Sequence, residues 1–113
     1  MPREVDKLGQ ENEVEGRLRT LVERAGGQCV KFVPDYARGW PDRILLLPGG
    51  VLVWVETKRP QDGRLSGGQR VAHLILRRLG QDVRTVWSKE EAEALVDELV
   101  QVSARQQKKG QPE

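Results

Sequence analysis

The feature that most limits how this chain can fold is a pair of apolar runs joined by a short turn, "DRILLLPGGVLVWVETK" at residues 42–58. Branched aliphatic and aromatic residues favour β-strands, and a Pro-Gly-Gly segment between two such runs is typical of a tight hairpin turn. The stretch therefore predicts an antiparallel hairpin in which residues 42–47 pair with residues 51–58.

Three charged side chains lie at the open end of this predicted hairpin. Asp42 begins its first strand, and Glu56 and Lys58 close its second. Side chains two positions apart on a strand point the same way, so Glu56 and Lys58 share a face, and strand pairing brings Asp42 close to them. Two carboxylates about 4 Å apart repel by roughly 4 kcal/mol at an effective dielectric constant of 20.

Two arrangements would relieve this repulsion. In the first, Lys58 is the counter-ion of a purely structural ion-pair cluster. In the second, a divalent cation neutralises both carboxylates. Charged residues rarely continue a strand as apolar as "VLVWV" without a function, which favours the cation. Carboxylate ligands with few imidazoles nearby indicate Mg²⁺ or Mn²⁺, not Zn²⁺.

The rest of the chain predicts helices and strands in a regular order. Helical spacing, strand-like runs and capping signals indicate a helix at 11–25, a strand at 28–33, a helix that begins at Ser66 and ends at Gly80, a strand at 82–87, and a helix that "SKEE" opens at Ser88 and that ends near Val100. With the hairpin included, the order is helix, three strands, helix, strand, helix. This order predicts an α/β fold in which helices flank a short mixed β-sheet.

The predicted helix after Ser66 carries two signals. Gln69 stands three residues after Ser66, which is the spacing of a capping box. The apolar residues Val71, Leu74, Ile75 and Leu79 are predicted to form the face that packs on the sheet. His73, the only histidine, falls outside that stripe, so we expect it at the surface and not as a base or a ligand.

Length and composition fit one intracellular domain. A chain of 113 residues can build one core but not two. No apolar run approaches the roughly 20 residues that span a bilayer, and the N-terminus lacks the apolar centre of a secretory signal. The single cysteine, Cys29, fits a reducing cytoplasm and a small core side chain. We expect a flexible N-terminus at 1–10, one domain at 11–100 and a disordered polar tail at 101–113.

The charge distribution is more informative than the net charge of +2. Acidic residues gather in the first 15 residues and at 89–98, whereas the middle of the chain is basic. Such a pattern is compatible with nucleic-acid binding, but a solvated surface explains it equally well. In the loop before Asp42, Tyr36 and Trp40 would either stack on bases or cover the core, and Arg38 is placed to meet a phosphate.

At these residues the chain resembles a known nuclease superfamily. Pro41-Asp42 followed by Glu56-Thr57-Lys58 resembles the PD-(D/E)XK motif. The surroundings, from an acidic first helix ending in "AGG" through "RGWPD" and "PGG" to "LSGGQRVAHLILRRLGQDVRTVWSKEEAEAL", resemble the VRR-NUC family of small phage and bacterial nucleases over residues 11–99. The resemblance implies a restriction-endonuclease-like core and a protein of a bacterial or phage-infected cell.

The resemblance also implies a set of site residues. Glu15, Asp42, Glu56 and the backbone carbonyl of Thr57 would hold Mg²⁺ or Mn²⁺. Lys58 would orient or activate the attacking water, and Gln69 would lie beside the active site. From the residues alone, a solvated helix charge explains Glu15 and the capping box explains Gln69.

The implied function is metal-dependent endonuclease cleavage of DNA. A small domain has little surface to read a sequence, and the family resemblance favours a homodimer selective for Holliday junctions or other branched DNA. Residues expected to contact DNA are Arg38, Trp40, Arg59, Arg64 and Arg70. The alternatives are a flap, nicking or restriction-type endonuclease, and a non-catalytic DNA-binding module.

Overall fold

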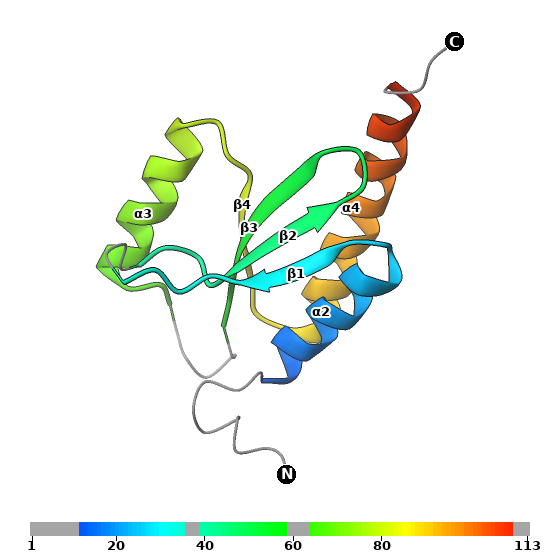
Figure 1. Ribbon diagram of the computed structural model, residues 1–113. Coiled ribbons are helices and arrows are strands. Elements are labelled where there is room, and N and C mark those ends of the chain that lie inside the picture. The colour runs from blue at the N-terminus through cyan, green and yellow to red at the C-terminus, as the bar shows by residue number, and fades with distance from the viewer. Residues whose placement is uncertain (1–11, 36–38, 59–63, 110–113) are drawn as a thin grey trace.

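The computed structural model describes residues 12–35, 39–58 and 64–109. Its elements, in chain order, are α2 (Glu13–Arg24), β1 (Gln28–Lys31), β2 (Arg43–Leu47), β3 (Val51–Thr57), α3 (Gly67–Arg78), β4 (Val83–Val86) and α4 (Lys89–Lys109). This order confirms the predicted α/β fold, with strand ends that differ from the predicted ones by at most two residues (Figure 1). None of the described helices is long and apolar enough to cross a membrane.

The four strands form one mixed sheet in the order β1-β2-β3-β4. The first three strands are antiparallel neighbours, whereas β4 pairs parallel to β3 after the chain has passed through α3. In the predicted hairpin Leu47 pairs with Val51 and Arg43 pairs with Val55. The same register, continued by one residue, sets Asp42 opposite Glu56 at the open end of the hairpin.

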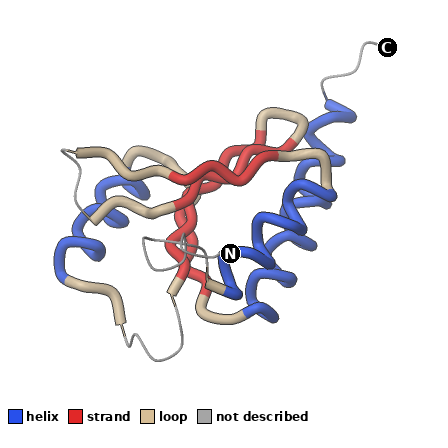
Figure 2. Tube along the Cα trace, turned by 60° about the horizontal axis from the view of Figure 1, so that its bottom comes forward, coloured by secondary structure: helices blue, strands red, loops and turns tan. Residues whose placement is uncertain are grey.

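The sheet separates the helices into two layers, with α2 and α4 on one face and α3 on the other (Figure 2). The main core lies between the sheet and the α2–α4 pair, and Cys29 packs against it as predicted. On β3 the side chains of Val51, Val53 and Val55 enter this core, which confirms the alternation expected of the strand. The face with Glu56 is therefore the face that α3 covers.

The prediction for the packing face of α3 is wrong. The apolar residues expected to face the sheet are 47–68% exposed, and they are Val71, Leu74, Ile75 and Leu79. The buried side chains are instead Ala72, His73 and Leu76, and His73, expected at the surface, is only 1% exposed. The cause is a hydrogen bond that Gln69 donates to Glu56, which turns the Gln69 face of the helix toward the sheet. Residues three, four and seven positions after Gln69 share its face, and these are the buried ones.

The prediction of a disordered tail from residue 101 is wrong for residues 101–109. Helix α4 continues to Lys109 because its last turns lie against the hairpin turn. The Ser103 hydroxyl donates a 2.6 Å hydrogen bond to the Pro48 carbonyl, and Ser103 is buried there. The segments 1–11 and 110–113 lie outside the described residues.

Both predicted capping signals form hydrogen bonds. Ser66 and Gln69 make the reciprocal capping box that opens α3. At the start of α4 the Ser88 hydroxyl accepts from the Glu91 amide at 3.1 Å, while the Glu91 carboxylate accepts from the amide of Trp87, one residue earlier than in a standard box. These caps fix the residues at which α3 and α4 begin.

Candidate active site

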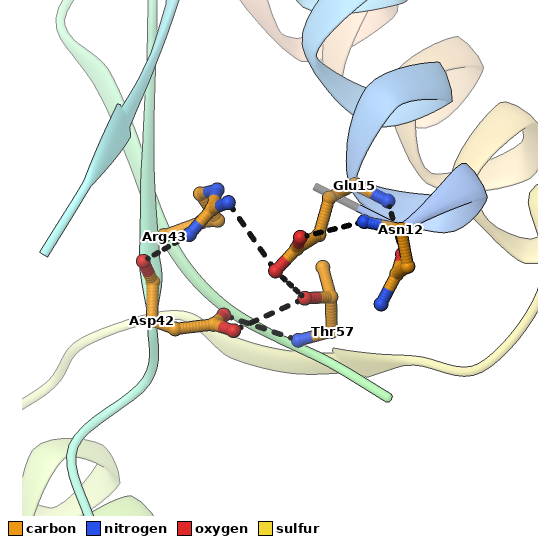
Figure 3. A network of polar contacts seen from close by, with 5 residues as sticks. All are labelled: Asn12, Glu15, Asp42, Arg43 and Thr57. Carbon is orange, nitrogen blue, oxygen red and sulfur yellow. Dashed lines mark hydrogen bonds and ion pairs between the residues drawn. The ribbon is translucent and has the colours of Figure 1, made fainter. Parts of the chain in front are cut away.

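Two carboxylates from distant parts of the chain meet at the hydroxyl of Thr57. Asp42 lies just before β2, Thr57 ends β3, and Glu15 is in the first turn of α2. The Thr57 oxygen lies 2.9 Å from Glu15 Oε2 and 3.1 Å from Asp42 Oδ2 (Figure 3). The Thr57 amide also donates to Asp42 Oδ1 at 3.2 Å.

This meeting point has too few protons for its acceptors. A hydroxyl carries one proton, so Thr57 cannot donate to both carboxylates at once. Burial raises the pKa of Asp42; Arg43 and the Thr57 hydrogen bonds oppose this rise, while the charge of Glu15 adds to it. The site therefore holds negative charge that its hydroxyl does not fully satisfy.

Glu15 is not a solvated helix charge, because it is buried against the sheet. Its Oε1 accepts from the Asn12 amide at 3.0 Å, and the Asn12 side chain accepts from the Glu15 amide at 2.9 Å. This capping box fixes the start of α2 and directs the second oxygen, Oε2, toward Thr57 and Arg43. The capping spacing "NEVE" was the sequence signal that would have located this contact.

Glu56 lies opposite Asp42 in the hairpin register but on the face covered by α3. Its Oε2 accepts from Gln69 Nε2 at 3.0 Å, and its Oε1 is buried with no hydrogen-bond partner among the described residues. Burial, followed by the charge of Asp42, raises the pKa of Glu56 to about 7, although Lys58 lowers it. A buried carboxylate with an unsatisfied oxygen is costly unless something binds it.

The side chain of Gln69 makes two hydrogen bonds. Its Oε1 accepts from the Ser66 amide at 2.9 Å as part of the capping box, while its Nε2 reaches Glu56. A pair of glycines brings this helix start close to the loop before Asp42. A Cβ atom on Gly39 would lie 2.6 Å from the carbonyl oxygen of Gly68, so the two backbones pass closer than any larger residue allows.

Lys58 lies close enough for its charge to act on both Glu56 and His73. The half-buried Lys58 follows β3, and its amide donates to the Val86 carbonyl at 2.9 Å. Burial lowers the pKa of His73, and the charges of Arg77 and Lys58 lower it further. Neither ring nitrogen of His73 has a hydrogen-bond partner within the described part of the chain. The spacing of four residues from Gln69 was the signal for its position.

The carboxylates of Glu15, Asp42 and Glu56 are ligands of the type that suits a divalent cation, but in the described structure they do not surround one. Among the described residues, no three His, Cys, Asp or Glu side chains are arranged to hold an ion. Glu56 Oε1 nevertheless has no partner, and Asp42 and Glu15 share one hydroxyl proton. Carboxylate oxygens with unmet negative charge are the ligands that Mg²⁺ and Mn²⁺ prefer.

The residues expected to contact DNA are only partly placed. Arg38, Arg59 and Tyr36 lie outside the described residues, whereas Arg64 and Arg70 are exposed. Trp40 packs its ring 6.0 Å from Phe32 and 5.5 Å from Trp54, centroid to centroid. This three-ring cluster accounts for Trp40 as a residue that covers the sheet face.

One residue of the site was missed by the sequence reasoning. Arg43 follows Asp42 directly, is buried, and forms an ion pair with Glu15. A charged residue at the start of the apolar run "RILLL" was the available signal.

Comparisons with known proteins agree with this fold and motif. No protein-family model matches the chain. A protein named "Putative nuclease p44", from Acyrthosiphon pisum secondary endosymbiont phage 1, is 41% identical over 54 residues. The match covers 48% of this chain and 58% of that relative, so the chain spans little more than half of the relative's length.

A solved structure described as a VRR_NUC domain superposes on the chain with a TM-score of 0.70 at 27% sequence identity. The superposition covers 74% of this chain and 90% of the other. The mixed four-stranded sheet with helices on both faces is the fold that the resemblance implied. In fold, and over part of its sequence, the chain is similar to VRR-NUC nucleases.

Proposed function

We propose that this protein is a metal-dependent endonuclease that hydrolyses phosphodiester bonds in DNA, in the cytoplasm of a bacterial or phage-infected cell. The observation that carries the proposal is the position of the three carboxylates. Glu15 and Asp42 meet at Thr57, and Glu56 stands opposite Asp42 with a buried oxygen that has no partner. The relatedness to a phage protein named as a nuclease supports the reaction class.

Each residue has a role that follows from its contacts. Glu15, Asp42, Glu56 and the Thr57 carbonyl would hold Mg²⁺ or Mn²⁺, which acts as a Lewis acid, neutralises developing charge and lowers the pKa of bound water. Gln69 holds Glu56 through one oxygen and leaves the other available. Lys58, whose charge acts on Glu56, would orient the attacking water, either as its base or as an ammonium that stabilises the transition state.

We propose branched DNA, such as a four-way junction, as the substrate of a homodimer. A domain this small offers little surface for reading a sequence, and two sites related by a two-fold axis suit two symmetric cuts. The exposed aliphatic stripe of α3, formed by Val71, Leu74, Ile75 and Leu79, supports a second copy as partner. A two-fold axis across α3 would bring the stripes of both copies together and remove them from water.

The test is cleavage of end-labelled four-way, flap, splayed and linear DNA in Mg²⁺ and in EDTA. Wild type is expected to cut only with Mg²⁺, and Asp42→Asn, Glu56→Gln and Lys58→Met should each lose at least about 100-fold in rate. Arg17→Met, which removes a half-exposed ion pair with Glu93 away from the site, is the matched control and should cut normally.

The panel also separates the alternatives. Preference for flap or nicked DNA, or sequence-specific cutting of linear duplex, would replace the junction proposal while leaving the nuclease intact. If all three site variants cut as well as wild type, the site assignment is wrong. If wild type binds DNA but cuts none of these substrates in Mg²⁺, the carboxylates form only a structural cluster and the protein is a non-catalytic DNA-binding module.

A further inference from the structure

Arg43 is a charged residue in a place where charge is costly. It begins β2 on the face of the sheet that packs against α2 and α4, and it is only 4% exposed. Its Nη1 donates to the Asp42 carbonyl at 3.0 Å, and its Nη2 lies 3.2 Å from Glu15 Oε2. Removing an arginine from water costs several kcal/mol unless its partners compensate, so its position requires an explanation.

The explanation lies in what Arg43 contacts. Figure 3 shows its guanidinium above the point where Glu15, Asp42 and Thr57 meet. Through Glu15 it reaches α2, and its Nη1 donates a hydrogen bond to the backbone carbonyl of Asp42. It is the one cation with a described ion pair to any of the three carboxylates. Its ion-pair partner, Glu15, is the one of these three carboxylates that lies on a helix, so this ion pair connects α2 to the sheet.

Resting on the metal site proposed above, we propose that Arg43 is a counter-ion that stands in for the divalent cation while none is bound. It neutralises Glu15 so that α2 stays docked on the sheet. The same Glu15 oxygen, Oε2, faces both Arg43 and Thr57, so a cation that binds Glu15 and Asp42 would share or take over this contact. Arg43 thus stabilises the metal-free protein and competes with the metal.

This competition makes a prediction that a purely structural ion pair does not. Without Arg43, Glu15 and Asp42 repel each other with only the Thr57 proton between them, so the metal-free protein should lose stability. A divalent cation should then bind more tightly, because no guanidinium repels it or occupies Glu15. A ligand that binds only the folded state raises Tm further the more tightly it binds, so the loss should be partly recovered in Mg²⁺.

The experiment measures Tm of the full-length protein in EDTA, in Mg²⁺ and in KCl of equal ionic strength. Arg43→Met is expected to have a lower Tm than wild type in EDTA and a Mg²⁺-induced rise in Tm about 5 °C larger than that of wild type. KCl should reproduce little of this rise. Arg43→Lys, which keeps the charge without the planar fork, should show a smaller increase in the same direction.

Two controls identify the cause. Arg84→Met removes ion pairs with Asp82 and Glu98 on the β4 side and should lose stability without any added response to Mg²⁺. The double variant Arg43→Met with Glu15→Gln removes both charges; it should regain stability in EDTA and lose the enhanced Mg²⁺ response.

The outcomes distinguish this inference from the proposed function. If wild type shows neither a Mg²⁺-dependent rise in Tm nor Mg²⁺-dependent cleavage, the metal site itself is wrong. If wild type responds and the Arg43 variants respond no more than wild type, the metal site stands and the counter-ion role of Arg43 is overturned. If Arg43→Met fails to fold, the response of Arg43→Lys relative to wild type decides.

Discussion

The Nε2 atom of Gln69 lies 3.0 Å from Oε2 of Glu56, while the other end of the same amide accepts a hydrogen bond from Ser66. One side chain therefore ends the loop, begins α3 and holds a carboxylate of the proposed metal site. Because this one amide both caps α3 and holds Glu56, a substitution that disturbs the helix cap should also disturb the position of Glu56, and the reverse.

Gln69→Glu separates the two roles of this amide. The substitution keeps a capping oxygen but replaces the donor to Glu56 with a second carboxylate. We expect a loss of about 1–3 kcal/mol in the free energy of unfolding at pH 8 that shrinks at pH 5, where the pair can share a proton. Urea unfolding at both pH values measures it.

Ser66→Ala is the matched control for Gln69→Glu. It removes the hydroxyl that accepts from the backbone N–H of Gln69, and it should lower the free energy of unfolding by about 1 kcal/mol at both pH values. Equal losses for Gln69→Glu at pH 5 and pH 8 would show that the contact with Glu56 contributes nothing.

The raised pKa of Glu56 predicts that metal-free protein loses stability as pH rises. The folded pKa is about 7 and the ordinary value is 4.5, so between these values the folded state holds a proton that the unfolded state has released. The free energy of unfolding contributed by this group therefore falls from pH 4.5 to about pH 7 and is constant above it.

Thermal unfolding in EDTA across this range, for wild type and Glu56→Gln, isolates the contribution. The wild-type profile should decline relative to the variant, which cannot titrate at this position. Addition of Mg²⁺ should reduce the wild-type decline, because a bound cation favours the ionised carboxylate. Parallel profiles in EDTA would contradict the raised pKa.

Gly39→Ala should loosen the contact between the loop before Asp42 and the start of α3. The new Cβ would meet the Gly68 carbonyl at 2.6 Å, and Gly39 has φ +85°, so both a clash and backbone strain oppose the change. We expect a loss of about 2–4 kcal/mol by urea unfolding.

Gly50→Ala provides the comparison, because Gly50 has φ +78° and nothing within 4 Å of its Cβ position. It should incur the backbone strain alone, about 1–2 kcal/mol. If the two variants are equally stable, the close approach of Gly39 to Gly68 does not contribute to stability.

The exposed stripe of α3 predicts where a homodimer would be disrupted. Sedimentation velocity at micromolar concentration should show a dimer for wild type and a monomer for Leu74→Glu, because a charge at the centre of the stripe would be buried on association. Leu52→Glu alters a comparably exposed leucine on β3, 41% against 48%, and should remain dimeric. A wild-type monomer would end the dimer proposal.

The sequence by itself determined the elements and their order. The alternation of "VLVWVE" and the Pro-Gly-Gly turn predicted the hairpin and the closeness of Asp42 to the charged end of its second strand, and the observed register sets Asp42 opposite Glu56. These features are local, since strand alternation, turn chemistry and capping boxes depend on residues a few positions apart. The motif at Asp42, Glu56 and Lys58 was readable for the same reason.

Only the tertiary structure decided which faces pack and where charges are neutralised. The most apolar stripe of α3 should have faced the sheet, yet the hydrogen bond from Gln69 to Glu56 turns His73 inward and leaves Leu74 exposed. Likewise Glu15 and Arg43, 28 positions apart, meet only because α2 docks beside the start of β2. Such long-range polar contacts compete with hydrophobic periodicity, and periodicity alone does not reveal which will prevail.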